Sequence, residues 1–242
     1  MRALALTVVI AALAGGCVSA APAGPYDRSA VMRVITASTV QLRADRDGGG
    51  RRAASGVVVA ADAARRRSWI VTARHFLDPG TRQKVSVSGV AGRARAAATV
   101  SAVSDEADLA LVEVEGLVLS AVVLKDHAQL GDEVWVAAFP FGRRLTVVSG
   151  TVSQIASEDG DVSLEGPVRM VDAQASYGSS GGGIYDAATG RLLGIVEGYR
   201  TARLTLPTTP ERTLDVPVPG ETTVLAAPSI RRFLRIIGIH GL

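Results

Sequence analysis

Short runs of β-branched and other apolar residues, separated by turn residues, recur along almost the whole of this 242-residue chain. Branched side chains pack well on a pleated surface, and Gly, Pro, Asn and Asp favour the turns between strands. Many short strands at this spacing predict an all-β protein, either a sandwich or a barrel. The expected strands are Val31–Leu42, Ser55–Ala60, Trp69–Thr72, Lys84–Val87, Leu109–Val114, Glu133–Ala137, Thr146–Ile155, Arg169–Asp172, Leu192–Val196 and Thr222–Ala226.

Three segments organise these strands. The polar, turn-rich segment Val122–Val134 separates two strand-dense halves of similar size, and we expect it to link two barrels. The segment Arg200–Gly220 carries four of the ten prolines and is expected to form a long surface loop or hairpin. Only the C-terminal stretch has clear helical periodicity. Its apolar residues recur three and four apart between Pro228 and Gly238, which predicts a helix over about 228–238.

The N-terminus has the layout of an export signal. Arg2 precedes an apolar stretch from Ala3 to Ala14, followed by small residues and prolines. The stretch is shorter than the roughly 20 residues that span a bilayer, which disfavours a permanent transmembrane anchor. Residues 1–24 are therefore expected to be a signal peptide, which places the protein in the bacterial periplasm or cell envelope, or outside the cell.

Two processing routes for this signal stay open. The residues before Cys17 resemble a bacterial lipoprotein box, in which the cysteine is acylated and anchors the protein to a membrane. The small residues of Val18-Ser19-Ala20 also form an acceptable site for ordinary signal peptidase, which would release the protein without a lipid.

Charge, cysteine and histidine content argue against several classes of function. The net charge of +3 comes from scattered arginines with acidic residues among them, and only 4% of residues are aromatic, so nucleic-acid binding is not expected. Cys17 is the only cysteine, and the chain can form no internal disulfide. His75, His127 and His240 are too widely spaced to suggest a ligand cluster, so neither a metal site nor a cofactor is expected.

The stretch DAQASYGSSGGGIYD, from Asp172 to Asp186, places two serines in a run of glycines. A nucleophilic serine needs room for a carbonyl group and backbone N–H groups aimed at the oxygen that becomes negative. Glycine provides both, because without Cβ it adopts positive φ and permits close approach. If Ser180 attacks, the N–H groups of Gly178 and Ser180 are the expected oxyanion hole. Such turns are also common as plain loops, so this stretch alone leaves both interpretations open.

Two further residues stand at the ends of expected strands. In WIVTARHF, His75 directly follows a buried strand, and in DEADLALVEVE, Asp108 directly precedes another. A partly desolvated carboxylate can orient an imidazole and stabilise its protonated form. Taken singly, His75 also fits a core histidine, and Asp108 a strand-capping surface acid. The joint occurrence of His75, Asp108 and Ser180 favours a catalytic triad.

These motifs and several others, in a consistent order from about Ser55 to Leu234, resemble the trypsin-like serine proteases, and specifically the protease domain of the bacterial HtrA/Deg type. The segments that carry the resemblance are SGVVVA, IVTARH, DEADLALVEV, LGDEVWVAAFPFG with TVVSGTVSQI, DAQASYGSSGGG, GRLLGIV and AAPSIRRFL. The resemblance implies an all-β, chymotrypsin-like fold with a double six-stranded antiparallel β-barrel and a C-terminal helix. On this basis, residues 25–242 form the protease domain, with barrel one over about 31–122 and barrel two over about 132–228.

The same resemblance implies a serine endopeptidase. His75 is the general base, Asp108 its orienter and Ser180 the nucleophile, and peptide bonds of envelope or extracellular proteins are hydrolysed through an acyl-enzyme. Protein or peptide substrates are the expected partners, and the oligomeric state is not predicted.

By this resemblance, Glu197, Gly198 and Tyr199 lie on the strand that pairs with the substrate backbone. Gln174 and Ala175 line the specificity pocket; neither is a carboxylate, so a small or medium apolar residue is expected before the cut. The Arg200–Gly220 segment, longer than the resemblance leads us to expect, is predicted to cover part of this pocket.

The sequence also departs from the family pattern. Gly183 stands where proline is usual, which predicts a looser turn, and Ser179 replaces an asparagine or aspartate, which leaves it a role in backbone geometry. Arg74 replaces a small residue beside His75, where it either lowers the basicity of the imidazole or points to solvent. The chain ends at Leu242, and no peptide-binding PDZ domain is expected.

Two alternatives remain. Residues Gly178–Gly182 also match the G-x-S-x-G pattern of α/β-hydrolases, for which Asp215 and His240 would complete the triad, although that serine must lead into a helix and the following residues favour strands. A second alternative keeps the protease fold without cleavage, as a binding or scaffold protein of the cell envelope.

Overall fold

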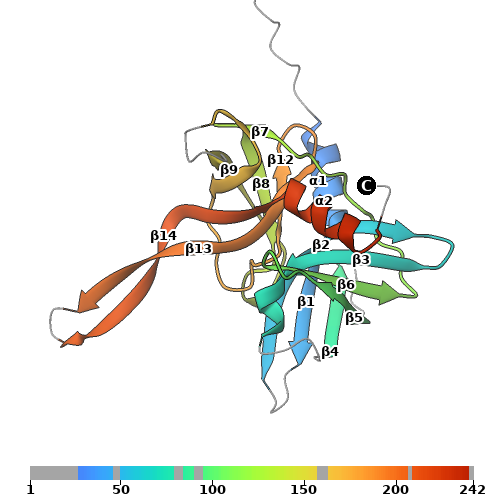
Figure 1. The fold of residues 1–242 in the computed structure, drawn as a ribbon, viewed down its shortest axis with the longest axis horizontal. Coiled ribbons are helices and arrows are strands. Elements are labelled where there is room, and N and C mark those ends of the chain that lie inside the picture. The colour runs from blue at the N-terminus through green and yellow to red at the C-terminus, as the bar shows by residue number, and fades with distance from the viewer. Residues whose placement is uncertain are drawn as a thin grey trace, which may run out of the picture.

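The fold consists of two closed, six-stranded antiparallel β-barrels joined along a shared interface (Figure 1). A computed structural model describes residues 27–45, 50–78, 84–89, 95–156, 163–206 and 209–239. The expected signal peptide, Cys17 and His240 lie outside these residues. The two barrels and the C-terminal helix confirm the predicted all-β double-barrel architecture.

Barrel one contains the first six strands in the order β1-β2-β3-β6-β5-β4. Alternate side chains of a strand point to opposite faces, and the inward ones fill the barrel with Leu42, Val58, Ile70, Val85 and Val112. The strands are β1 (Thr39–Asp45), β2 (Arg51–Asp62), β3 (Arg67–Ala73), β4 (Lys84–Gly89), β5 (Ala96–Val103) and β6 (Leu109–Glu115).

Barrel two closes in the order β11-β14-β13-β12-β8-β9. Its interior holds Val136, Val152, Val171, Ile184 and Leu193. The strands are β8 (Glu133–Ala138), β9 (Thr146–Ile155), β11 (Val168–Asp172), β12 (Gly183–Asp186), β13 (Leu192–Leu206) and β14 (Thr209–Ala226), and the short strands β7 (Ala128–Gln129) and β10 (Glu165–Gly166) pair beside this barrel.

The prediction of a strand over Val31–Leu42 is wrong for most of its length. Residues Arg28–Ser38 form helix α1, and the strand begins only at Thr39. Asp27 caps the helix, because its carboxylate accepts hydrogen bonds from the N–H groups two and three residues later. The β-branched residues of this segment favour a strand, but burial of one helical stripe between the barrels outweighs that preference.

The phenol of Tyr185 ties the end of α1 to barrel two. Its oxygen lies 3.2 Å from Oγ of Ser38 and 2.8 Å from Oγ1 of Thr39. The side chain is completely buried, and burial raises the pKa of Tyr185 to about 12, so the phenol is neutral.

Helix α2 (Ala227–Ile236) follows β14 directly. It packs Ile230, Phe233 and Leu234 into a cluster that also contains residues of α1 and both barrels. The helix begins with Pro228 in its first turn, as predicted. Across the residues with a described structure, no helix has the length and apolar character needed to cross a membrane.

The segment between the barrels runs in contact with both of them. The N–H of Val122 donates to the carbonyl of Val58 at 3.0 Å, and the N–H of Lys125 donates to the carbonyl of Leu192 at 2.8 Å. The ammonium group of Lys125 also pairs with the carboxylate of Asp186. These contacts hold the two barrels in one relative position.

The Arg200–Gly220 segment forms a hairpin, the second of the two predicted forms. Strands β13 and β14 continue past the barrel as a two-stranded arm that projects from the molecule (Figure 1). Within the arm, Arg203 pairs with Asp215 at 2.9 Å, and the neighbouring pair Leu204 and Leu214 is about half exposed.

Candidate active site

Strand pairing brings His75 and Asp108 together. His75 lies in the short turn Arg74–Leu77 that follows β3, and Asp108 immediately precedes β6. These strands are hydrogen-bonded neighbours, with Ala73 opposite Leu109, so the end of one lies beside the start of the other. The backbone N–H of Arg74 also donates to the carbonyl of Asp108 at 3.0 Å.

The carboxylate of Asp108 holds His75 by two contacts. Oδ1 accepts the backbone N–H of His75 at 2.8 Å, and Oδ2 lies 2.5 Å from Nδ1 of the imidazole. The other ring nitrogen, Nε2, lies 3.0 Å from Oγ of Ser180. The structure therefore brings all three predicted residues into one hydrogen-bonded chain, at the interface between the barrels.

The environment of His75 favours the protonated imidazole. The hydrogen bond that the imidazole donates to Asp108 is the largest influence, and together with the charge of that carboxylate it raises the pKa of His75 above its usual 6.5. Partial burial and the charge of Arg52 act in the opposite direction. Arg74, for which the sequence left two roles open, is exposed and donates to the carbonyl of Ser104 at 2.8 Å, and it is not among the groups that shift the pKa of His75.

Two glycines of the serine loop have positive φ, Gly178 at +87° and Gly181 at +79°. A Cβ on Gly181 would lie 2.2 Å from the carbonyl oxygen of Ser55 and 2.3 Å from Oγ1 of Thr72. A Cβ on Gly178 would lie 2.8 Å from the nitrogen of Phe141. Both positions therefore require glycine for backbone conformation and for space.

Ser55 of barrel one fixes the serine loop from both sides, and the sequence analysis did not identify it. Its hydroxyl donates to the carbonyl of Gly178 at 2.9 Å, and its backbone N–H donates to the carbonyl of Ser180 at 2.9 Å. The hydroxyl also accepts the N–H of Phe139 at 2.8 Å. Ser55 is a polar residue at the start of an otherwise apolar strand, and it is buried. A buried hydroxyl needs hydrogen-bond partners, and this was the only feature of the sequence that could have pointed to Ser55.

The peptide group between Tyr177 and Gly178 is held in a defined orientation. The carbonyl of Tyr177 accepts the N–H of Phe141 at 2.7 Å. In a trans peptide the carbonyl and the N–H point in opposite directions, so the N–H of Gly178 points away from Phe141. Neither Gly178 nor Ser180 uses its N–H in a hydrogen bond within the described part of the chain. Both groups are thus available to an incoming oxygen.

Ser179 supports the turn and does not face the imidazole. It is 3% exposed, its N–H donates to the carbonyl of Ser176 at 2.9 Å, and its hydroxyl accepts the N–H of Ser176 at 3.2 Å. These contacts agree with the role in backbone geometry that the sequence predicts for Ser179.

One cavity borders the triad, and a second cavity adjoins the first at Tyr177 and Tyr199. The first, of about 290 Å³, lies at Ser180 and His75. The second, of about 260 Å³, is lined by both Gln174 and Ala175. The predicted substrate-binding residues Glu197, Gly198 and Tyr199 all line the first cavity, and Tyr199 lines the second as well. Residues Pro217–Gly220 at the base of the hairpin arm line the second cavity.

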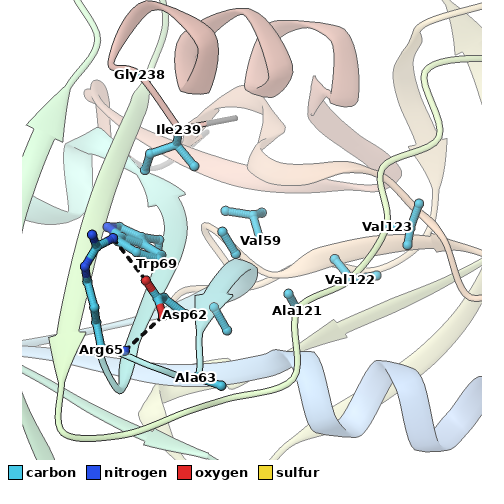
Figure 2. A pocket seen from close by; sticks show the side chains of 12 residues that line it. Val59, Asp62, Ala63, Arg65, Trp69, Ala121, Val122, Val123, Gly238 and Ile239 are labelled. Carbon is cyan, nitrogen blue, oxygen red and sulfur yellow. Dashed lines mark hydrogen bonds and ion pairs between the residues drawn. The ribbon is translucent and has the colours of Figure 1, made fainter. Parts of the chain in front are cut away.

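A third cavity, of about 730 Å³, lies elsewhere on barrel one (Figure 2). Trp69, Val122 and Ile239 line it. At its edge, the backbone N–H and a guanidinium N–H of Arg65 both donate hydrogen bonds to the carboxylate of Asp62. This cavity is larger than the two near Ser180, but none of the three triad residues lines it. It is therefore separate from the candidate active site.

Gly183, which replaces the usual proline, makes space for an aromatic ring. A Cβ on Gly183 would lie 2.3 Å from Cε2 of Tyr185, because residues two apart in β12 share a face. Gly183 pairs with both Ala137 and Ile195, so the expected looser turn does not occur here. The substitution lets Tyr185 reach α1.

The α/β-hydrolase interpretation is wrong, because the fold contains two antiparallel barrels and Gly183 starts a strand. Asp215, its proposed acid, lies on the hairpin arm in an exposed pair with Arg203. Within the described residues, there is also no group of three or more His, Cys, Asp or Glu side chains that could hold a metal ion.

Comparisons with known proteins agree with this architecture. An HtrA-type protease, AlgW solved with a tripeptide, has a TM-score of 0.66 and 20% sequence identity, over 88% of this chain and 64% of that chain. This likeness shows the shared fold, and the present chain spans 64% of the length of that protein. A search of curated proteins found no match.

A comparison of the sequence with models of protein families identifies the family of this chain. Residues 54–195 match the model of the trypsin-like peptidase domain. This range covers more than half of the chain and includes His75, Asp108 and Ser180. The chain therefore belongs to the trypsin-like peptidase domain family.

Proposed function

We propose that this trypsin-like peptidase is a serine endopeptidase that cleaves peptide bonds through His75, Asp108 and Ser180. The contact of 3.0 Å between Nε2 of His75 and Oγ of Ser180, with Asp108 on the other ring nitrogen, carries the proposal. A nucleophile, a base and an orienting carboxylate in this order are the groups that acyl transfer requires.

In the proposed reaction, Oγ of Ser180 attacks the substrate carbonyl carbon while Nε2 of His75 takes the hydroxyl proton. The N–H groups of Gly178 and Ser180 donate to the resulting oxyanion, and each such donor typically lowers the barrier by about 2.7–4 kcal/mol. His75 then gives the proton to the leaving amine as the C–N bond breaks, which leaves an acyl-enzyme. Water, activated by the same imidazole, hydrolyses this ester and restores Ser180.

The proposed substrates are extended protein or peptide segments. Glu197, Gly198 and Tyr199 belong to β13 and line the cavity at Ser180, which suits β-augmentation by a substrate strand. Gln174 and Ala175, without a carboxylate, favour a small or medium apolar residue before the cut. The N-terminal sequence supports envelope or extracellular substrates, and acylation of Cys17 would keep the enzyme at a membrane.

The proposal is tested with the chain lacking residues 1–24, incubated with a diverse peptide mixture whose products are sequenced by mass spectrometry. We expect internal cleavage with small or medium apolar residues before the cut.

The variants Ser180→Ala and His75→Ala should produce no cleavage. Equal cleavage by wild type and Ser180→Ala would identify a contaminant and reject the proposal, and cuts predominantly after Lys or Arg would reject the predicted specificity. A protein that cleaves nothing but still binds peptides would be the scaffold of the alternative interpretation.

A further inference from the structure

The cavity at Ser180 has an arginine in its wall. Arg52, in β2, is partly buried and lines this cavity together with His75. Its guanidinium donates a hydrogen bond to the backbone carbonyl of His75, which fixes the group beside the imidazole. No carboxylate among the described residues forms an ion pair with Arg52. A guanidinium has five N–H donors, and the hydrogen bond to His75 uses one of them.

Arg43 and Arg51 also lie at this end of barrel one, on strands β1 and β2. Burial, followed by the charges of Arg95 and Arg51, lowers the pKa of Arg43. Arg51 pairs with Asp45 at 2.9 Å, and Arg43 donates to the carbonyl of Gly142 at 3.1 Å. Successive residues of a strand face opposite sides, so Arg51 and Arg43, which pairs with Ala53, lie on the other face of the sheet from Arg52 and do not line its cavity. Arg52 is therefore the arginine that a substrate meets in this cavity.

The chemistry determines which part of a substrate meets Arg52. His75 gives its proton to the leaving amine, so this amine must lie beside Nε2, and the chain after the cleaved bond continues on the side of His75. Arg52 is hydrogen-bonded to His75 itself and belongs to the same barrel. Glu197, Gly198 and Tyr199 line the same cavity but come from β13 of barrel two. The leaving segment, and not the acyl segment, thus passes Arg52.

We propose that Arg52 is a specificity-determining residue that binds a carboxylate in the first three residues after the cleaved bond. This inference rests on the proposed endopeptidase function and adds a substrate class to it. An extended chain advances about 3.3 Å per residue, so three residues cover about 10 Å of the cavity wall. Glu197, which forms no ion pair within the described structure, lines the same cavity from β13, where it repels a carboxylate. The carboxylate is either an Asp or Glu side chain or the C-terminus of a short leaving segment.

The test compares quenched fluorescent peptides that differ only after the cut. One series carries Asp, Asn or Lys at each of the first three positions and an amidated C-terminus, and a second series ends in a free carboxylate two residues after the cut. We expect kcat/KM to be roughly tenfold higher for Asp than for Asn at one of these positions, because a charge-assisted hydrogen bond in a partly buried site is worth about this factor. If only the second series responds to substitutions at Arg52, the bound group is the terminal carboxylate.

Substitutions at Arg52 identify the source of this preference. Arg52→Gln should reduce the Asp/Asn ratio to about one, Arg52→Lys should retain part of it, and Arg52→Glu should favour Lys instead. The ratio is independent of any general loss caused by releasing the carbonyl of His75, because that loss affects all peptides equally. Arg191→Gln, at an exposed position in the turn before β13, is the matched control and should keep the wild-type ratio.

Binding separates this inference from the proposed function. Fluorescence anisotropy with Ser180→Ala should show tighter binding of the Asp peptide or the free-carboxylate peptide than of its neutral counterpart, and the double variant with Arg52→Gln should lose the difference. This result would support the Arg52 site even if no peptide were cleaved. A ratio of one for every peptide in the wild type, or an equal preference in Arg52→Gln, would overturn the proposal.

Discussion

Ser55 of barrel one and Ser180 of barrel two are joined by a backbone hydrogen bond of 2.9 Å, so the candidate nucleophile is held by the barrel that also carries His75 and Asp108. The Ser55 hydroxyl adds contacts to Gly178 and Phe139. The reacting groups therefore depend on the interface between the barrels for their positions, and each barrel alone has an incomplete site.

The hydroxyl of Ser55 is expected to contribute to both stability and catalysis. Ser55→Ala leaves the buried N–H of Phe139 and the carbonyl of Gly178 without their partner, which should lower the free energy of unfolding by about 1–3 kcal/mol. It should also reduce kcat more than it changes KM, because the oxyanion donor is less well placed. Urea unfolding and steady-state kinetics measure both effects.

Ser153→Ala is the matched control for Ser55→Ala. The hydroxyl of Ser153 is buried without a hydrogen-bond partner in the described structure, so its removal should be neutral or stabilising. Equal destabilisation by the two substitutions would contradict the role assigned to Ser55.

Asp108→Asn tests the orientation of the imidazole. The amide nitrogen of asparagine in place of Oδ2 would donate to Nδ1 of His75, and the ring proton would move to Nε2, where it blocks proton acceptance from Ser180. We expect kcat to fall roughly 10⁴-fold with little change in the circular dichroism spectrum. Asp105→Asn, at an exposed acid three residues earlier, should keep full activity. Similar activities of the two variants would exclude Asp108 from the mechanism.

The pH dependence follows from the raised pKa of His75. Only the neutral imidazole accepts the proton of Ser180, so kcat/KM should fall toward acid pH with a midpoint above the usual 6.5. Asp108→Ala should move this midpoint to lower pH, and Arg52→Gln should move it to higher pH, because Arg52 opposes protonation. Profiles with a substrate that has no titratable group measure these shifts. A wild-type midpoint below 6.5 would contradict the account.

The same pKa has a consequence for stability. A group whose pKa is higher in the folded state stabilises the fold below its unfolded pKa, and this contribution disappears as pH rises through the folded value. Denaturation with His75→Ala as reference should therefore show a stabilising difference at mildly acidic pH that is lost at alkaline pH. The opposite trend would show that burial, and not Asp108, dominates the environment of His75.

Gly183 gives a prediction about packing. In Gly183→Ala the new methyl group would overlap the ring of Tyr185, which is completely buried and hydrogen-bonded to Ser38 and Thr39. We expect a loss of about 1–3 kcal/mol in the free energy of unfolding. Gly89→Ala is the control, because nothing lies within 4 Å of its added Cβ. An effect of Gly183→Ala no larger than that of the control would mean that the ring moves freely.

Most of the strands and the three residues at the site could be predicted from the sequence, although β5 was not among the expected strands and Val31–Ser38 is helical. The alternation of apolar and polar residues along a strand, and the turn residues between strands, can be recognised from short stretches of sequence. His75 and Asp108 each stand next to an apolar strand, and the pairing of β3 with β6 brings them together. The glycines around Ser180 can likewise be recognised in the sequence, because two of them have a positive φ that other residues rarely adopt.

Long-range packing explains what the sequence analysis missed. The segment over Val31–Ser38 has residues that suit a strand, and only burial between the barrels makes it a helix. The bond of Ser55 to Gly178 joins residues 123 apart in the chain, and no local pattern signals it. The contact of Phe141 with the carbonyl of Tyr177 depends on a phenylalanine with φ of +54°, a conformation rare for this residue and set by its surroundings.

The most direct test of the central claim is covalent labelling of the folded protein with a fluorophosphonate, followed by mass spectrometry of the labelled peptide. We expect one label on Oγ of Ser180, and its loss in His75→Ala although Ser180 is still present. Labelling of Ser179 in place of Ser180, or equal labelling of Ser180 with and without His75, would contradict the proposal that the imidazole activates this serine.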